Sequence, residues 1–269
     1  MRQSVGKNYL LKMEHPIGKV FKTSLLFYAL MLLPIGFFQL SFLGAQVDSI
    51  WVYPSYFITE SAGKYGTIFI LILCAWFYGI RLETKKEKLI AFIKSFLSLL
   101  FFFILFAYLN EHITKPLVSA ARPSHIYIFS NSGWPQEVIS FYEKSKTSRS
   151  EILQLLLQKN DSNFQNIHPL VQAHWIEESG FSFPSGHSFN SWMIAVVLSY
   201  SILQFRVKHQ YRKYFWIPFV WAALVAISRV MLGAHTIVDI AAGSFMGILV
   251  ACGFLYFDKT RPLLFQKRG

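Results

Sequence analysis

The sequence is 269 residues long, with 54% hydrophobic and 17% aromatic residues but only 15% charged residues, and its formal net charge is +12. Ordinary soluble domains carry about 25% charged residues, so this composition argues against a disordered chain, a coiled coil and a typical cytosolic enzyme. It predicts an integral membrane protein.

Six apolar stretches are long enough to cross a lipid bilayer as helices. The hydrocarbon core, about 30 Å thick, needs roughly 20 apolar residues of helix. Such stretches lie near residues 24–43, 65–82, 89–109, 188–205, 214–234 and 236–257. We therefore expect an all-α integral membrane protein with six transmembrane helices, folded as a single domain over residues 1–269. Cys74 and Cys252 lie inside these stretches, which argues against a disulfide framework or a cysteine-based zinc site.

Lysine and arginine residues gather in four places along the chain. They precede the first stretch and follow the second, the fourth and the sixth, which is one side of an alternating six-helix path. The positive-inside rule then predicts that both termini are cytoplasmic. Because no basic stripe is interleaved with stacking aromatic residues, we expect these clusters to contact lipid headgroups and not nucleic acid.

The polar segment between the third and fourth stretches, residues 110–187, is predicted to form a loop subdomain on the outer face. Within it, Ile152, Leu155, Leu156 and Lys159 follow helical spacing. This pattern fits an amphipathic helix on the membrane surface, and it fits a helix packed on its own subdomain equally well.

A set of ionisable and small residues is predicted to meet at the outer membrane level. Charges inside a membrane are costly and usually have a function. Counting the apolar stretches places residues from three distant segments at this level: Lys115, Arg122, Ser185, Gly186, His187, Arg229, His235 and Asp239. Such convergence predicts a functional site.

The cations of this set indicate the kind of ligand. Lys115, Arg122 and Arg229 suit an oxyanion that carries more than one charge, because arginine can direct two donors at phosphate oxygens. Ser185 and Gly186 open a predicted helix, where free backbone N–H groups favour an anion. Ser185 is equally well interpreted as an ordinary helix cap.

The histidines indicate the chemistry. His235 and Asp239 are four residues apart, so on one helix face the carboxylate can orient the imidazole ring. His187, from another helix, can supply the proton that a leaving alkoxide needs.

Written as patterns, these residues are Lys115-x6-Arg122-Pro123, Pro184-Ser185-Gly186-His187 and Ser228-Arg229-x5-His235-x3-Asp239. The three patterns resemble the signature of the type 2 phosphatidic acid phosphatase (PAP2) superfamily. The run from His174 to Phe181, together with the long outer loop, is similar to the bacterial phosphatidylglycerophosphatase B subfamily. The resemblance implies that His235 is the nucleophile, that Asp239 orients it and that His187 is the general acid. It also implies that the phosphoryl oxygens are bound by Lys115, Arg122, Ser185, Gly186 and Arg229.

The function that this resemblance implies is that of a metal-independent lipid phosphatase. It would hydrolyse the terminal phosphate of phosphatidylglycerophosphate, undecaprenyl diphosphate, phosphatidic acid or a similar lipid through a phosphohistidine, with no cofactor and no obligatory protein partner. The expected location is a bacterial inner membrane, with the site facing the periplasm. A lipid phosphotransferase or a lipid A phosphatase would use the same site. An ion or anion transporter, an alternative of a different class, predicts charges near the bilayer midplane and broken helices.

Overall fold

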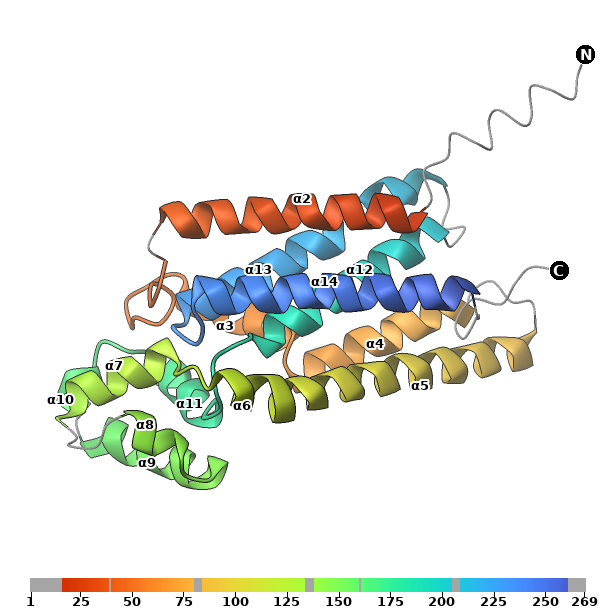
Figure 1. Ribbon diagram of the computed structural model, residues 1–269. Helices are drawn as coiled ribbons and strands as arrows, with labels where there is room; N and C mark the ends of the chain where they lie inside the picture. Colours follow the sequence, from red (N-terminus) through yellow and green to blue (C-terminus); the bar gives the residue numbers. More distant parts are fainter. Residues whose placement is uncertain are drawn as a thin grey trace, which may run out of the picture.

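The computed structural model describes residues 16–38, 40–79, 84–133, 138–159, 161–204 and 209–260. Helices form almost all of the regular structure in these ranges, and a single antiparallel bridge joins Gln46 to Ile167. Long helices run side by side, and a group of short helices covers one end of them (Figure 1). The first long helix begins, and the last one ends, at the opposite end.

The long helices alternate in direction along the chain. They are α2 (Pro16–Phe37), α4 (Lys64–Gly79), α5 (Lys85–Leu109), α12 (Gly186–Gln204), α13 (Ile217–Met231) and α14 (Ile237–Thr260). The short helix α3 (Val52–Ser61) precedes α4, and the 3-10 turn η2 (His209–Tyr214) precedes α13. Helix α5 continues through a π-helical turn, η1 (Asn110–Thr114), into α6 (Lys115–Val118).

Each predicted apolar stretch coincides with one long helix in the part of the chain that the structure describes, but the bounds differ. Residues 39, 80–82 and 205 of the predicted stretches lie outside the described residues. The first helix covers residues 16–37 instead of 24–43, because the chain after it forms turns in which the Gly44 N–H bonds the Met231 carbonyl oxygen. The third helix continues beyond residue 109 to Val118. These shifts arise because hydropathy marks the apolar centre of a helix and not its ends.

Within the described ranges, four segments are by themselves long and apolar enough to cross a membrane: Pro16–Phe37, Lys85–Val118, Tyr211–Met231 and Ile237–Phe257. A fifth crossing results if Val52–Ser61 and Lys64–Trp76, which meet at a bend of 53°, are taken as one. The chain is therefore a multi-pass helical membrane protein. Helix α12 does not pass the same test of length and hydropathy.

Helix α12 lies at the centre of the long helices, in contact with α2, α4, α5, α13 and α14. Trp192, Ala195 and Val196 of this helix are completely buried. On α14, a side chain at Gly243 would collide with the backbone of Ser185, just before α12, and one at Gly247 would collide with the backbone of α12 at Phe189. Glycine therefore lets the two helix backbones approach closely.

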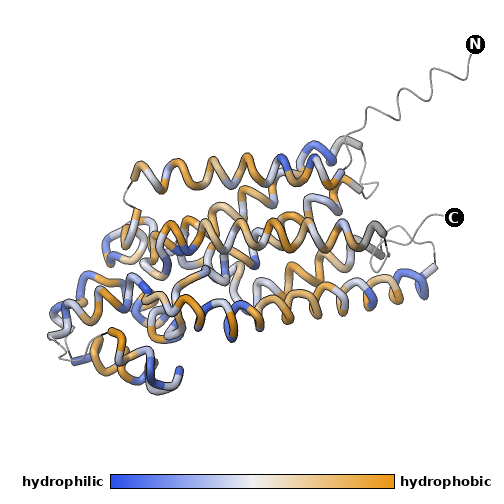
Figure 2. Tube along the Cα trace, in the orientation of Figure 1, coloured by the Kyte–Doolittle hydropathy of each residue, from blue (hydrophilic) through white to orange (hydrophobic). Residues whose placement is uncertain are grey.

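The short helices form a second group with its own hydrophobic cluster. They are α7 (Pro123–Ser132), α8 (Val138–Tyr142), α9 (Lys146–Lys159), α10 (Asp161–Phe164) and α11 (Pro169–Glu177). Helix α9 buries Leu153, Leu156 and Leu157 in this cluster, while Leu155 is 61% exposed. Of the two interpretations of its spacing, packing on its own subdomain therefore agrees with the structure. Polar residues concentrate on this group and at the far ends of the long helices (Figure 2).

Hydrogen bonds tie the short helices to the turn between α13 and α14. The Trp175 indole N–H donates to the Leu232 carbonyl oxygen at 2.8 Å. The His168 N–H donates to the carbonyl oxygen of Ala45, and Gly44 is bonded to Met231. These contacts place α11 and the segment that follows it directly over the turn that carries His235.

Candidate active site

The eight predicted site residues all lie at the end of the bundle that the short helices cover. They occupy helix ends or turns: Lys115 begins α6, Arg122 precedes α7, Ser185 precedes α12, Gly186 and His187 begin α12, Arg229 is in the last turn of α13, His235 is in the α13–α14 turn and Asp239 is in the first turn of α14. Three segments that are distant in the sequence therefore converge as expected.

A cavity of about 430 Å³ lies among these residues. Five of the predicted residues line it: Lys115, Arg122, Gly186, His187 and His235. Ser185, Arg229 and Asp239 are not part of its lining and are at most 3% exposed.

The turn that carries His235 is held rigidly. Gly233 has a φ of 69°, a left-handed conformation that glycine adopts without strain. The Ala234 and His235 N–H groups both donate to the Arg229 carbonyl oxygen, at 3.0 and 3.2 Å. The Nε2 atom of His235 lies 3.2 Å from Nη1 of Arg122. Since a guanidinium group can only donate, Nε2 is the acceptor, and its lone pair is directed at Arg122, which also lines the cavity.

Asp239 lies next to the His235 ring, as the four-residue spacing predicts, but the two side chains form no direct hydrogen bond. Its Oδ2 atom is 3.7 Å from Nδ1 of His235, which is too far for a hydrogen bond. Ser182 lies between them: its hydroxyl donates to Oδ2 at 2.6 Å and is 3.3 Å from Nδ1. The Thr236 N–H also donates to Oδ2, at 2.6 Å. Asp239 therefore orients the imidazole through the Ser182 hydroxyl, and the start of α14 holds the carboxylate.

Arg122 is fixed by a set of carbonyl groups. Its Nε donates to the Gly180 carbonyl oxygen at 2.9 Å, and its Nη1 donates to that of Ala234 at 3.2 Å. Its own N–H donates to the Tyr142 hydroxyl of α8 at 3.0 Å. Elements from both helix groups thus position this side chain.

Arg229 is completely buried and has a different set of partners. Its Nη1 donates to Nε2 of His174 at 2.7 Å. Its Nε has no hydrogen-bond partner among the described residues. Lys115, by contrast, pairs with Glu111 one turn earlier at 2.6 Å.

Glu178 is the main site residue to which the sequence analysis assigned no role. One carboxylate oxygen lies 2.6 Å from Nη2 of Arg122, and the other lies 2.8 Å from Nη2 of Arg229. The second oxygen is also 3.6 Å from Nδ1 of His187. The two guanidinium groups thus bind the two oxygens of one anionic group.

Glu178, His174 and His235 lie outside the membrane-spanning segments and have shifted pKa values. Burial by itself would raise the pKa of the Glu178 carboxyl, but Arg229 and Arg122 hold it well below its usual value. Burial, with Arg229 nearby, lowers the pKa of His174 to about 4, so that this ring stays neutral and accepts from Arg229. Burial and Arg122 also lower the pKa of His235, which keeps its Nε2 lone pair free of a proton.

Ser185 has the role of a helix cap in the structure. Its Oγ accepts from the Ser188 N–H at 3.4 Å and from the Ser188 hydroxyl at 3.0 Å. Gly186 and His187 follow it and line the cavity. At the start of α12, Gly186 and His187 therefore line the cavity, whereas the Ser185 side chain is buried and does not.

The site is suited to an anion. Two of the carboxylates that line it are already paired with cations, Glu178 with two arginines and Glu111 with Lys115, which makes these two poor ligands for a metal ion. Displacement of the Glu178 carboxylate would expose two fixed guanidinium groups next to a neutral imidazole. This arrangement can bind a phosphoryl group and present a nitrogen nucleophile to it.

The sequence indicated little about the three further residues that contact the site, namely His174, Glu178 and Ser182. His174 and Glu178 lie in the run that resembled one bacterial subfamily, but the spacing said nothing of their contacts. Ser182 lies just before the second motif, and no pattern distinguishes it from other serines.

Comparison with known proteins gives an independent result. The family model described as the PAP2 superfamily matches residues 95–262, more than half of the chain. Phosphatidylglycerophosphatase B of Bacillus subtilis (strain 168) is 44% identical over 98 residues, which are 35% of this chain and 48% of that protein. Phosphatidylglycerophosphatase B of Escherichia coli (strain K12) is 28% identical over 194 residues, 67% of this chain and 66% of that protein.

A further relative is named as a transport protein and not as a phosphatase. The bacitracin transport permease protein BcrC of Bacillus licheniformis is 33% identical over 121 residues, which are 43% of this chain and 52% of that protein. The chain thus spans about half to two thirds of the length of these relatives.

Proposed function

Because this chain belongs to the PAP2 superfamily, we propose that it is a metal-independent lipid phosphatase. It removes the terminal phosphate of a membrane lipid such as phosphatidylglycerophosphate, undecaprenyl diphosphate or phosphatidic acid. The observation that carries this proposal is the position of His235 Nε2, beside the cavity and 3.2 Å from a buried arginine.

Binding begins with replacement of the Glu178 carboxylate. The terminal phosphoryl group takes its place between Arg122 and Arg229, whose positions are already set by Gly180, Ala234 and His174. The unpartnered Nε of Arg229 offers one more donor. The cations then stabilise the charge that develops on the phosphoryl oxygens, as a metal ion does in other phosphoryl-transfer sites.

The Arg122 N–H moves from His235 Nε2 to a phosphoryl oxygen, which frees the Nε2 lone pair. Nucleophilic attack then forms a bond between Nε2 and phosphorus while the bond to the lipid oxygen breaks. The Nδ1 proton stays directed at the Ser182 hydroxyl, which Asp239 orients. His187, in its protonated form, donates a proton to the leaving oxygen of the lipid and becomes neutral. Water, deprotonated by His187, then attacks phosphorus, breaks the phosphorus–nitrogen bond and releases inorganic phosphate.

We further propose that the chain crosses the membrane six times, with α12 as the fourth span. Its low hydropathy is compatible with spanning, because the surrounding helices shield its serines from lipid: Ser188, Ser191, Ser199 and Ser201 are at most 1% exposed. The proposed location is a bacterial inner membrane, with both termini cytoplasmic, and residues 110–187 and the site at the periplasmic face. The basic clusters along the chain support this orientation.

The experiment that tests the activity is phosphate release in EDTA from four lipids: phosphatidylglycerophosphate, undecaprenyl diphosphate, phosphatidic acid and lipid A. We expect release from at least one of them. His235→Ala should lower the rate by on the order of 10⁴-fold or more, because it removes the nucleophile. His112→Ala, an exposed histidine one turn before the site, is the matched control and should keep its activity. Activity that depends on an added divalent ion, or an active His235→Ala variant, would refute the mechanism.

A phosphotransferase would use the same residues and differ in the acceptor. Incubation with two lipids distinguishes the two reactions: hydrolysis releases inorganic phosphate, whereas transfer yields a newly phosphorylated lipid. A lipid A phosphatase is distinguished by the substrate panel.

The second candidate function is that of a transporter, and two observations favour it. The α3–α4 pair is bent by 53°, as in a broken span, and one relative is named as a transport permease. The charged residues of the site, however, lie at helix ends and not in the middle of the bundle. The position of the charges therefore favours the phosphatase.

A further inference from the structure

One tyrosine hydroxyl of the short helices connects α8 to the start of α7. The Tyr142 hydroxyl accepts the Arg122 N–H at 3.0 Å. It also lies 2.6 Å from Nδ1 of His125, which is completely buried in the first turn of α7. Arg122 is the N-cap residue of the same helix. Two groups from one helix start therefore contact a single hydroxyl.

The proton positions in this contact follow from the donors and acceptors present. The hydroxyl accepts from Arg122 and has one proton to donate, and Nδ1 of His125 is its other partner among the described residues. The hydroxyl therefore donates to Nδ1. Without the hydroxyl, the Arg122 N–H and His125 Nδ1 would both be buried and unpaired, which is unfavourable.

The Tyr142 ring contacts a second segment of the site. It stacks on Phe181, with the ring centroids 4.7 Å apart and the ring planes within 12° of each other. In the sequence, Phe181 lies between Ser182 and Gly180, whose carbonyl oxygen accepts from Arg122 Nε. Tyr142 thus contacts the backbone of Arg122 through its hydroxyl, and a segment that holds the Arg122 side chain through its ring.

Tyr142 and His125 do not line the cavity that Arg122 and His235 line. An effect of this pair on the reaction must therefore pass through Arg122, whose Nη1 is 3.2 Å from His235 Nε2. Groups that stabilise developing charge depend on exact placement, so a small shift of one guanidinium group is costly.

We propose that Tyr142, oriented by His125, is a positioning residue that keeps Arg122 aligned with the phosphoryl group in the transition state. The inference rests on the proposed function. It adds that α8 contributes to catalysis without contacting the substrate.

The test is a double-mutant cycle, measured as phosphate release in EDTA from the lipid of the four-lipid panel that the wild type hydrolyses fastest. Tyr142→Phe keeps the stacked ring and removes only the hydroxyl. It should lower kcat by about 5- to 30-fold, the effect of leaving a buried donor unpaired, with KM changed by less than about 3-fold. In an Arg122→Ala background, the same substitution should change kcat by less than about 2-fold, because Tyr142 acts through the Arg122 side chain.

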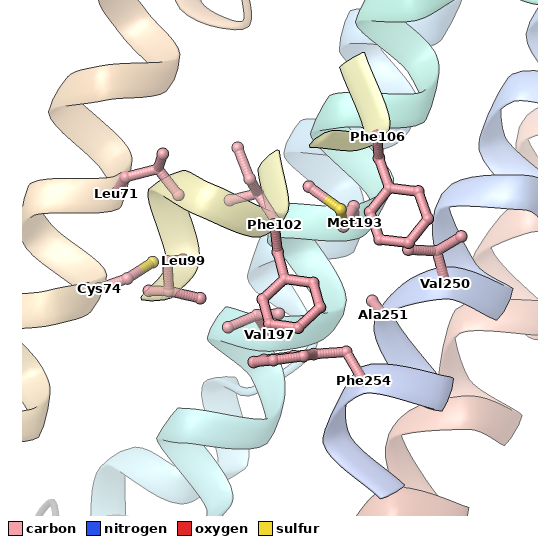
Figure 3. Close-up of a pocket in the computed structure, with 11 residues that line it drawn as sticks. Leu71, Cys74, Leu99, Phe102, Phe106, Met193, Val197, Val250, Ala251 and Phe254 are labelled. Carbon is pink, nitrogen blue, oxygen red and sulfur yellow. The ribbon is translucent and has the colours of Figure 1, made fainter. Parts of the chain in front are cut away.

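Two controls separate positioning from general effects of mutation. Tyr127 of α7 packs on Trp175, and its hydroxyl has no hydrogen-bond partner among the described residues, so Tyr127→Phe should leave kcat unchanged. Val197 of α12 lines an apolar cavity with Phe102 and Phe254 (Figure 3). Val197→Ala should lower the Tm without changing kcat at temperatures well below that Tm, because it removes only apolar contacts.

His125 is tested by a pair of replacements. His125→Asn keeps an oxygen acceptor near the position of Nδ1, whereas His125→Leu keeps only the bulk of the side chain. We expect kcat of the Asn variant to lie within about 3-fold of the wild type, and kcat of the Leu variant to fall as far as that of Tyr142→Phe. Equal kcat values for the two His125 variants would overturn the proposal, even if Tyr142→Phe does not fold.

The outcomes of the cycle are distinguishable. An equal decrease of kcat in both backgrounds would mean that Tyr142 supports folding alone, and would overturn the positioning role. An active wild type with an unaffected Tyr142→Phe variant would also overturn it, while leaving the proposed function intact. A wild type inactive on all four lipids would overturn the proposed function, and the positioning role with it.

Discussion

At the scale of single residues, two buried guanidinium groups dominate the electrostatics of the site. Arg122 and Arg229 are at most 2% exposed, and burial of such charges is unfavourable unless a counter-charge is near. Glu178 supplies that charge with contacts of 2.6 and 2.8 Å. The same carboxylate occupies the position proposed for substrate. Glu178 thus has two proposed roles: it stabilises the two buried arginines, and the phosphoryl group displaces it on binding. A mutation can separate these roles.

Glu178→Gln should destabilise the protein by about 3 kcal/mol, because it leaves two buried guanidinium groups without a charged partner. Inorganic phosphate should then raise the Tm of this variant more than that of the wild type, since it replaces the missing negative charge. Thermal unfolding in detergent, with and without phosphate, measures both effects.

The matched control for this prediction is Glu177→Gln. Glu177 lines the same cavity but is exposed and forms no ion pair with the described residues. Its variant should unfold like the wild type. An equal phosphate-induced rise in Tm for the wild type and Glu178→Gln would contradict the assignment of Glu178.

At the scale of elements, the site depends on how closely α12 packs against α14. Helix α12 carries Gly186 and His187, while Asp239 lies in the first turn of α14, and the Ser185 N–H donates to the Asp239 carbonyl oxygen at 3.0 Å. Gly243 and Gly247 make this approach possible. The contact between these two helices therefore sets the separation of the proposed acid and nucleophile.

Gly247→Ala should destabilise the protein by about 1–3 kcal/mol and lower activity, because the added methyl group collides with the backbone at Phe189. Gly253→Ala is the control on the same helix, with no atom within 4 Å of the added Cβ. It should be neutral or stabilising by up to about 1 kcal/mol, because alanine favours helix. Thermal unfolding of both variants checks this, and equal Tm values would argue against the close contact.

At the scale of the whole molecule, the charged residues of the cavity lie at one end of the bundle, whereas the apolar surface runs along the long helices. The long helices expose apolar residues such as Phe69 and Phe101 along their length, as expected for surfaces in lipid. The cavity lies at the end where the short helices gather (Figure 1). A lipid held in the bilayer can thus place its headgroup in the cavity while its chains stay among apolar side chains.

The proposed orientation predicts which residues are accessible from outside an intact cell. In a variant without Cys74 and Cys252, Lys146→Cys on α9 should react with a membrane-impermeant maleimide added to spheroplasts. Lys85→Cys, at the start of α5, should react only after the membrane is permeabilised. Both positions are exposed, so a lack of reaction reports orientation and not burial. The reverse pattern would place the site on the cytoplasmic side.

Much of the fold was predictable from the sequence, because the relevant signals are local. Long apolar runs with helical length determine where the long helices lie, and the positions of Lys115, His187 and Arg229 relative to those runs place them at helix ends. Counting the helices then predicts, without knowledge of packing, that the three motifs lie at the same level of the membrane. The ends of the helices were less predictable, since turns and the π-helical extension of α5 depend on contacts with other segments.

The sequence by itself determined that this is a helical membrane protein with three motif segments converging on one site. The tertiary structure decided how these residues contact one another. It placed Ser182 between His235 and Asp239, and it joined Arg122 to Arg229 through Glu178. Helix periodicity relates residues within one helix, whereas these contacts arise because the segment after α11 folds back over the α13–α14 turn, an arrangement that only packing between distant segments can set.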